Sequence, residues 1–247
     1  MTTKKLLSVM RKGIEKYKMI NDGDKIAVGI SGGKDSLLLL QLLAEFRRFS
    51  PQKFEVMGIS VDLRFDGMDT DYSKIQEFCK NLGVEFVAVR TDIGQIVFTE
   101  RKEKSPCALC SRMRKGALYE TAKKYGCNKV ALGHHANDLE DTFILSLFYE
   151  GRLSTFAPKS YLDRTGITLI RPMIMIEEKD VLPFAPYLPV IKSKCPADKN
   201  SQRAFVKTAI RELSKTIPNI RDMLYTALTH PERYNLFDRY ESEIDKF

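Results

Sequence analysis

The sequence predicts an α/β fold in which helices cover both faces of an open, mostly parallel sheet, with further C-terminal helices packed on it. Short apolar segments rich in β-branched residues alternate with longer segments in which apolar residues recur at the helical period. This alternation is typical of parallel strands joined by crossover helices. Polar residues follow three of the expected strands. Ligands of such sheets bind beyond the carboxyl ends of the strands, so these polar residues predict one shared site.

The first expected elements are a helix, a strand and a second helix. Residues 3–19 place their apolar side chains on one face of a helix. Residues 25–30 are short, apolar and bounded by turn residues, which predicts a buried strand. Residues 37–46 have the length and the leucine content of a helix. The loop between them, residues 31–36, is the first polar cluster.

The same alternation continues along the chain. Gly83 and Gly126 are suited to end the helices that precede them, because glycine readily adopts the left-handed conformation found at helix ends. Residues 92–108 are expected to be a connecting segment. The further strands are expected at residues 55–63, 85–90, 129–133 and 167–170, and the further helices at residues 71–82, 109–125 and 138–149.

The C-terminal part is expected to be helical and interrupted by prolines. Pro183 and Pro186 shorten or kink any helix in residues 177–188. Two amphipathic helices are expected at residues 200–217 and 220–229. We therefore expect two parts, a sheet domain with its preceding N-terminal helix in residues 1–190 and a helical extension that carries Cys195 in residues 191–247.

Length and composition limit the class of protein. The chain has 247 residues, of which 43% are hydrophobic, enough for a sizeable core. No apolar stretch approaches the roughly 20 residues that cross a bilayer. The N-terminus also lacks the apolar region of a signal peptide. We therefore expect a cytoplasmic protein that does not associate with membranes.

The charge of the chain suits a polyanionic partner. The net charge of +8 comes from 40 basic and 32 acidic residues. Two of the basic clusters, Arg112–Lys115 and Lys192–Lys194, flank cysteines. Basic groups around a reactive centre suit a substrate such as RNA, although surface solvation accounts for part of the excess.

The most informative stretch is the polar loop after the first strand. A pair of glycines between a strand and a helix lets backbone N–H groups approach an anion closely, and the N-terminus of the helix adds positive potential. A phosphate group of a nucleotide is the ligand that fits this arrangement. The loop consists of Ser31, Gly32, Gly33, Lys34, Asp35 and Ser36.

Two side chains of this loop predict its chemistry. Lys34 supplies a positive charge for phosphate, and Asp35 can hold a magnesium ion bound to that phosphate. The loop is not a Walker A motif, because that motif needs a glycine where this chain has Val28. From their positions at strand ends, Asp62, Gly133 and His134 are also expected to contribute to nucleotide binding.

A second signal is the pair of cysteines at the start of a helix, Cys107 and Cys110. Their spacing suits zinc, an iron–sulfur cluster or a redox dithiol. A four-cysteine zinc site would need a second such pair, which the sequence lacks, and the context is not that of a thioredoxin-like motif. We expect Arg112, Arg114 and the helix N-terminus to lower the pKa values of both thiols.

Cys195 is the candidate for a third ligand, because it lies in a polar loop where a cysteine used only for packing would be unusual. Three thiolates can hold a [4Fe-4S] cluster and leave one iron open for another ligand. Cys79 and Cys127 are expected to be packing residues. The odd count of five cysteines argues against a disulfide framework.

Together these motifs resemble the PP-loop ATP pyrophosphatase superfamily, and within it the tRNA 2-thiocytidine synthetase (TtcA-type) family. The resemblance covers roughly residues 20–238 and is most specific where the loop at Ser31–Ser36 is combined with three cysteines. Beyond the loop it is carried by Cys107–Tyr119, Ala131–Asp138, Ile170–Met173, Cys195, Ser201–Arg203 and Asn235–Asp238.

The resemblance implies an enzyme with ATP, Mg²⁺ and a [4Fe-4S] cluster on the fold of the adenine nucleotide alpha hydrolases. Such enzymes adenylate the C2 oxygen of a tRNA pyrimidine, here cytidine 32. Sulfur carried at the open iron of the cluster, as hydrosulfide or persulfide, then displaces AMP. The sulfur donor would be a cysteine desulfurase or free sulfide. Family members are often dimers, so a homodimer is left open. Catalytic roles are implied for Cys107, Cys110, Cys195 and Asp138.

The sequence departs from the family pattern at Asn137 and after Cys195, whose counterpart in the family belongs to a second C-x-x-C-like stretch whereas no further cysteine follows here, and it leaves two other functions open. Members commonly carry paired aspartates where this chain has Asn137 and Asp138, so Asp138 would carry any metal or proton role alone. One alternative is a cluster-free RNA ligase of the lysidine synthetase type, in which an amine attacks the adenylate. The other is a nucleotide-binding protein whose cysteines sense redox state.

Overall fold

The structure, a computed structural model, describes residues 2–101, 106–192, 194–196 and 202–234. The strands join into one sheet in the order β3-β2-β1-β4-β6-β5. Every neighbouring pair is parallel except β5 and β6, so the expected open and mostly parallel sheet is confirmed. The strands are β1 (Asp24–Ile30), β2 (Phe54–Asp62), β3 (Glu85–Arg90), β4 (Lys129–Ala131), β5 (Lys159–Leu162) and β6 (Ile167–Ile170).

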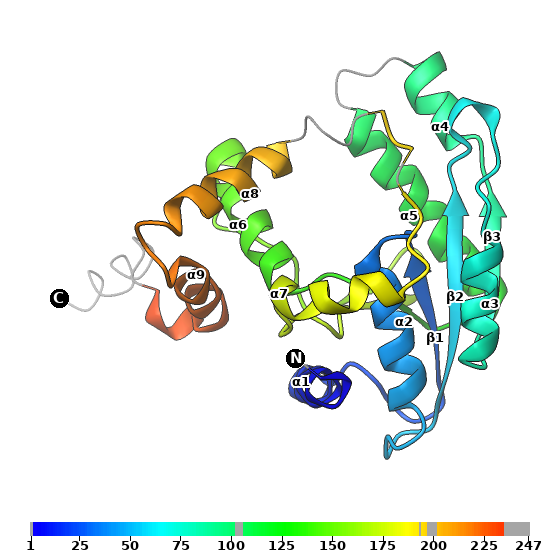
Figure 1. Ribbon diagram of the computed structural model, residues 1–247, viewed down its shortest axis with the longest axis horizontal. Coiled ribbons are helices and arrows are strands. Elements are labelled where there is room, and N and C mark those ends of the chain that lie inside the picture. Colours follow the sequence, from blue (N-terminus) through cyan, green and yellow to red (C-terminus); the bar gives the residue numbers. More distant parts are fainter. Residues whose placement is uncertain (1, 102–105, 193, 197–201, 235–247) are drawn as a thin grey trace. The chain divides into compact units, whose positions relative to one another are not determined.

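The helices alternate with these strands as expected (Figure 1). The longer helices are α1 (Thr3–Lys16), α2 (Lys34–Phe46), α3 (Ser73–Asn81), α5 (Pro106–Lys124), α6 (Ala136–Glu150), α8 (Gln202–Leu213) and α9 (Ile220–Thr229). The short helical turns are η1 (Phe65–Gly67), α4 (Ile93–Gln95), η2 (Ile96–Glu100, a π-helix), α7 (Glu178–Val181), η3 (Leu182–Tyr187) and η4 (Pro231–Arg233).

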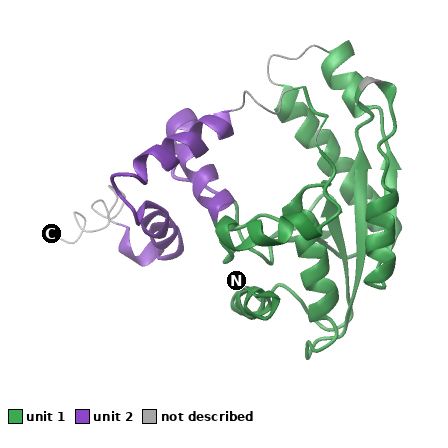
Figure 2. Ribbon diagram, in the orientation of Figure 1, with its two compact units in different colours: residues 1–136, 156–201 green, residues 137–155, 202–247 purple. Residues whose placement is uncertain are grey.

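The chain forms two compact units (Figure 2). Unit 1 comprises residues 1–136 and 156–201 and contains the sheet, whereas unit 2 comprises residues 137–155 and 202–247. Cys195 belongs to unit 1. The domain boundary expected at residue 190 stays a prediction.

The two faces of the sheet carry different helices because side chains alternate along each strand. Leu118 and Ala122 of α5 share a buried cluster with Ala27 of β1. On the other face, α2 contacts β1 and β2, and the Cys79 thiol of α3 lies close to Gly58 of β2. The sheet is therefore covered on both faces, and its strand ends remain available at the edge where the loops emerge.

Some expected elements differ in the structure. Strand β4 ends at Ala131, earlier than the sequence indicated, because Gly133 leaves the sheet to pass against α2. Strand β5 was not expected. The connecting segment at residues 92–108 includes α4, the π-helical turn η2 and the first turn of α5. Ser201 and Asn235–Asp238 lie outside the described residues.

The remaining sequence expectations concern the C-terminal helices and membranes. Both amphipathic helices are present as α8 and α9. Within the described ranges, none of the helices combines the length and the hydropathy needed to span a bilayer.

Unit 2 contains a buried cluster of charges. Glu140 and Asp141 of α6 are almost fully buried, and both contact one guanidinium, Arg221 of α9, at 2.5 and 3.1 Å. Asn137 donates a hydrogen bond to Glu140, and Lys207 of α8 lies 3.9 Å from Asp141. Burial raises the pKa of the Glu140 carboxyl to about 7, and the neighbouring Asp141 adds to the shift, although Arg221 opposes it.

This pKa predicts how stability depends on pH. Folded Glu140 keeps a proton that the unfolded chain releases, so the free energy of unfolding should fall as the pH rises from about 4.5 to about 7. Glu140→Gln removes this titration, and we expect the variant to lose that part of the decrease in thermal melting experiments between pH 5 and 8. Glu150→Gln on the same helix is the matched control, because Glu150 is exposed. An unchanged pH profile in Glu140→Gln would contradict the assignment.

Candidate functional site

The loop after β1 is ordered by its own side chains. The backbone N–H of Ser31 donates to the Ser36 hydroxyl at 3.1 Å, and that hydroxyl donates to the Gly33 carbonyl at 2.9 Å. Gly32 has a φ of +83°, which favours glycine. Helix α2 begins with Gly33 as its N-cap, and no side chain caps it. The uncapped N-terminus suits binding of an anion by backbone N–H groups.

Lys34 and Asp35 lie together at this helix start. The Lys34 ammonium lies 3.2 Å from the Asp35 carboxylate and 3.1 Å from the Glu178 carboxylate of α7. Burial by itself lowers the pKa of Lys34, but the two carboxylates more than offset burial and raise it. Lys34 therefore keeps its positive charge, as a phosphate ligand requires.

Asp35 has an oxygen that fits a metal ion. Its Oδ1 is buried and, within the described part of the chain, accepts no hydrogen bond, and the Lys34 ammonium lies 3.2 Å from it as an ion pair. His135 Nε2 lies 3.9 Å from this oxygen. A buried carboxylate oxygen beside a phosphate-binding loop is a typical ligand of Mg²⁺.

Gly133 brings the end of β4 against the loop. A Cβ atom at this position would lie 2.9 Å from the backbone carbon and oxygen of Asp35 and 3.0 Å from the Ser36 nitrogen. The sheet order reverses between β1 and β4, which is where open α/β sheets bind ligands. Gly133 thus lies beside the expected nucleotide site, and the structure gives it a packing role there.

His134 lies in a cluster of aromatic and cationic groups. Its ring is 4.9 Å from the Phe156 ring, and Arg171 Nε donates to His134 Nδ1 at 3.3 Å. Burial lowers the pKa of Arg171 to about 10. Contact between His134 and a nucleotide stays a prediction.

Asp62 at the end of β2 orders a neighbouring loop. Its carboxylate accepts hydrogen bonds from the Thr70 N–H at 2.8 Å, from the Thr70 hydroxyl at 2.9 Å and from the Arg64 N–H at 3.2 Å. Asp62 is buried and lines the cavity described below. Its hydrogen bonds give it a positioning role, and direct binding of a cofactor by Asp62 stays a prediction.

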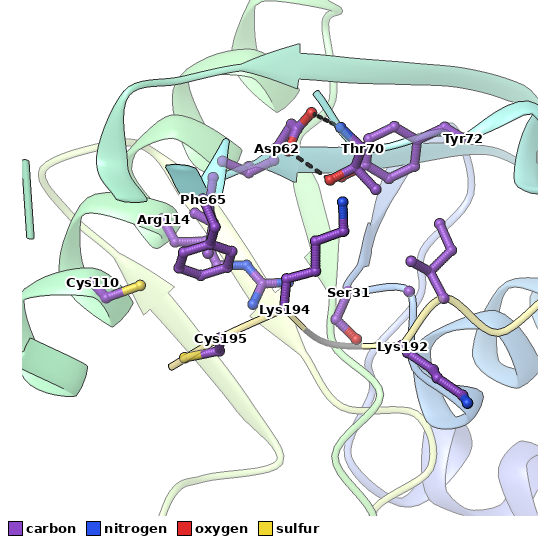
Figure 3. A pocket seen from close by; sticks show the side chains of 14 residues that line it. Ser31, Asp62, Phe65, Thr70, Tyr72, Cys110, Arg114, Lys192, Lys194 and Cys195 are labelled. Atoms are coloured by element: carbon purple, nitrogen blue, oxygen red, sulfur yellow. Dashed lines mark hydrogen bonds between the residues drawn. The ribbon is translucent and has the colours of Figure 1, made fainter. Parts of the chain in front are cut away.

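One cavity of about 280 Å³ joins the loop to two of the cysteines (Figure 3). Ser31 and Gly32 line it together with Cys110 and Cys195. The Cys195 segment is tied to the loop, because the Ile191 N–H donates to the Gly32 carbonyl at 2.9 Å. The cavity also includes Arg114, Lys192 and Lys194, so its wall is rich in positive charge.

The expected lowering of the Cys110 pKa is wrong. Burial raises the pKa of the Cys110 thiol, and the negative charges of Cys195 and Cys107 raise it further, whereas Arg114 alone opposes the shift. The sequence pattern indicated the arginine but not the burial of the thiol. Cys107 and Cys195 therefore each lie within electrostatic reach of the Cys110 thiol.

The ligand set of three cysteines stays a prediction. Among the described residues, no three His, Cys, Asp or Glu side chains are gathered closely enough to bind a single metal ion. A [4Fe-4S] cluster attaches its thiolates to different iron atoms, so its ligands are farther apart than those of a single ion. Cys107 is exposed and Cys110 and Cys195 are half-buried, so all three are accessible.

Cys79 and Cys127 differ from these three. Both are buried in the apolar core, and burial raises each pKa to about 11. A thiol with this pKa stays protonated at neutral pH. The expectation that they are packing residues is confirmed.

Asp138, the other expected catalytic residue, lies in the first turn of α6 in unit 2. There Arg203 Nη1 is 3.8 Å from its carboxylate, and the same guanidinium donates to the Thr142 hydroxyl at 3.0 Å. A catalytic role for Asp138 stays a prediction.

Two residues of the site were missed in the sequence. Glu178 contacts Lys34 across 144 positions of the chain, and no local pattern indicates such a partner. Ile191 holds the cysteine segment through its backbone, which leaves no signal in its residue type. The basic residues around Cys195 were visible as a cluster, and Lys192 and Lys194 do line the cavity.

Comparisons with known proteins show the family of this chain. A family model described as a PP-loop domain matches residues 3–216. The tRNA-cytidine(32) 2-sulfurtransferase of Syntrophotalea carbinolica is 38% identical, over 95% of this chain and 92% of its own length. That of Geobacter sulfurreducens is 35% identical, over 95% of this chain and 93% of its own.

A solved structure extends the comparison to three dimensions. The U34-tRNA thiolase NcsA from Methanococcus maripaludis, determined with its [4Fe-4S] cluster, superimposes with a TM-score of 0.76 at 25% identity. The match covers 94% of this chain and 79% of the thiolase. The chain therefore belongs to the PP-loop family and, within it, to the family of the tRNA-cytidine(32) 2-sulfurtransferases.

Proposed function

We propose that this protein uses ATP to replace the C2 oxygen of cytidine 32 in tRNA with sulfur. The observation that carries the proposal is that Ser31 and Gly32 of the phosphate loop line the same cavity as Cys110 and Cys195. An enzyme that activates a base with ATP and then transfers sulfur to it needs both the ATP site and the cysteines within reach of that base. The names of the related sulfurtransferases and of the thiolase support this reading.

The part of the cavity next to the phosphate loop would activate the base. The C2 oxygen of the base forms a bond to the α-phosphorus of ATP while the bond from that phosphorus to pyrophosphate breaks. Lys34 and the N-terminus of α2 stabilise the charge that builds on the departing pyrophosphate. Asp35 would hold Mg²⁺ through its buried Oδ1, and the ion would neutralise phosphate charge.

The part of the cavity next to the cysteines would supply the sulfur. Cys107, Cys110 and Cys195 would hold a [4Fe-4S] cluster, which fits because Cys110 and Cys195 line one cavity, Cys107 lies three residues from Cys110 on α5, and thiolates are the usual ligands of such clusters. When bound, the cluster would supply an iron able to hold hydrosulfide, taken directly from free sulfide or formed from the persulfide of a cysteine desulfurase by a two-electron reductant. Hydrosulfide would then bond to C2 of the activated base, AMP would leave with the original oxygen, and the thiol proton would be released.

Mass spectrometry of tRNA nucleosides tests this function. We expect 2-thiocytidine to be missing from the tRNA of cells that lack the gene, and to return when the wild-type gene is restored. Other thionucleosides in the same sample are the internal control and should not change. Unchanged 2-thiocytidine would contradict the proposal, and loss of a thiouridine instead would overturn the assignment of the base.

A further inference from the structure

The cavity holds a phenylalanine whose ring has no role in the chemistry described so far. Phe65 lines the cavity, and Figure 3 shows its ring pointing inward beside Arg114 and Lys194. The Phe98 ring lies 5.7 Å from the Phe65 ring at 62°, an edge-to-face contact that fixes the orientation of Phe65. The ring thus presents a supported apolar surface among charged and polar groups.

The chain holds Phe65 in place through the residue before it. Arg64 has a φ of +48°, which is rare for a residue with a side chain. Its N–H donates to Asp62, and its guanidinium contacts Asp92 at 2.9 Å and Asp69 at 3.0 Å. So many contacts on one strained residue indicate that the direction of the next side chain matters.

Gly94 packs closely against the backbone of the same turn. Gly94 N–H donates to the Leu63 carbonyl at 2.8 Å, and a Cβ on Gly94 would lie 2.6 Å from that oxygen and 3.2 Å from the Phe65 Cα. Backbone atoms therefore fix the position of Phe65 from two sides.

The surroundings of the ring define what can bind on it. Cys110 and Cys195 line the cavity with it, as do Ser31 and Gly32. A volume of about 280 Å³ is near the lower limit of ligand pockets and fits one base better than a whole nucleoside triphosphate. An aromatic ring next to cations is the arrangement that proteins use to stack an extruded base while its phosphates are held.

We propose that Phe65 is the stacking surface for the target pyrimidine of the tRNA, and that Lys192 and Lys194 contact the phosphates next to it. This inference rests on the proposed function. Both lysines are exposed and line the cavity. The adenine of ATP is the competing occupant, but the base that receives sulfur must itself reach the thiols, and Phe65 shares the cavity with them.

The absence of tryptophan from the sequence provides a direct test. Phe65→Trp introduces a single tryptophan, and its fluorescence should be quenched by an anticodon stem-loop RNA that carries cytidine 32. The same RNA with an abasic site at that position should quench much less. Quenching by ATP in the absence of RNA, or equal quenching by both RNAs, would overturn the proposal. Phe49→Trp is the control, because Phe49 is exposed and lies outside the cavity lining.

Phe65→Ala provides the second measurement. We expect it to weaken binding of the cytidine-containing RNA by roughly 5- to 150-fold, the usual effect of losing one stacked base, with unchanged affinity for ATP. Phe65→Tyr keeps the ring and should bind as the wild type does. If the wild type thiolates tRNA and Phe65→Ala binds the RNA equally tightly, this inference fails while the proposed function stands.

Discussion

Cys110→Ala is expected to abolish tRNA thiolation. Cys110 lines the cavity, and the charges of Cys107 and Cys195 both act on its thiol. The variant would leave only two of the three proposed protein ligands for a [4Fe-4S] cluster. We therefore expect protein purified without oxygen to lose its iron and acid-labile sulfide. In cells whose only copy of the gene encodes this variant, the 2-thiocytidine content of tRNA should be as low as in a strain without the gene.

Cys127→Ala is the matched control for this change. The Cys127 thiol is buried in the core and does not line the cavity, so we do not expect it to bind the cluster. Iron content and thiolation should stay as in the wild type. Full iron and sulfide in Cys110→Ala, or zinc without iron in the wild type under the same conditions, would exclude the cluster.

Gly133→Ala is expected to have the second largest effect, on the binding of ATP. The added Cβ would lie within 3.0 Å of three backbone atoms of Asp35 and Ser36, so the start of α2 has to move. Because the proposed phosphate site includes that backbone, we expect the affinity for ATP to fall by about tenfold or more, or about 1.4 kcal/mol, in titration calorimetry. The melting temperature should also fall.

Gly116→Ala is the matched control for Gly133→Ala. It replaces a glycine by alanine without the clash expected at Gly133. Gly116 lies inside α5, and apart from its chain neighbours and the backbone of its own helix, no described atom lies within 4 Å of its added Cβ. Alanine is the better helix former by about 1 kcal/mol, so this variant should bind ATP normally and melt no lower than the wild type. ATP binding by Gly133→Ala that equals that of Gly116→Ala would show that the helix start tolerates the displacement.

The sequence predicted the local parts of this protein well. The phosphate loop depends on residues at consecutive positions, so Ser31–Ser36 were visible together. The parallel strands at the centre of the sheet carry apolar residues on both faces, so their positions could also be predicted from the sequence. Strand β5 was missed because it is a short edge strand, and its pairing with β6 depends on contacts outside its own four residues.

Properties that depend on tertiary burial could not be predicted in the same way. The basic residues near Cys110 indicated a lowered pKa, but the depth of the thiol in the fold decides the direction. Gly133 was expected to bind a cofactor, and only the structure shows its close approach to the backbone of Asp35. Glu178 became part of the site through folding alone.

The hydrogen bond from the Ile191 N–H to the Gly32 carbonyl has a consequence for substitutions in either segment. Gly32 belongs to the loop before α2, and Cys195 follows Ile191 by four residues. Because the contact joins two backbone groups, it does not depend on the side chain at position 191, and it keeps the Cys195 segment in register with the loop when that side chain is changed.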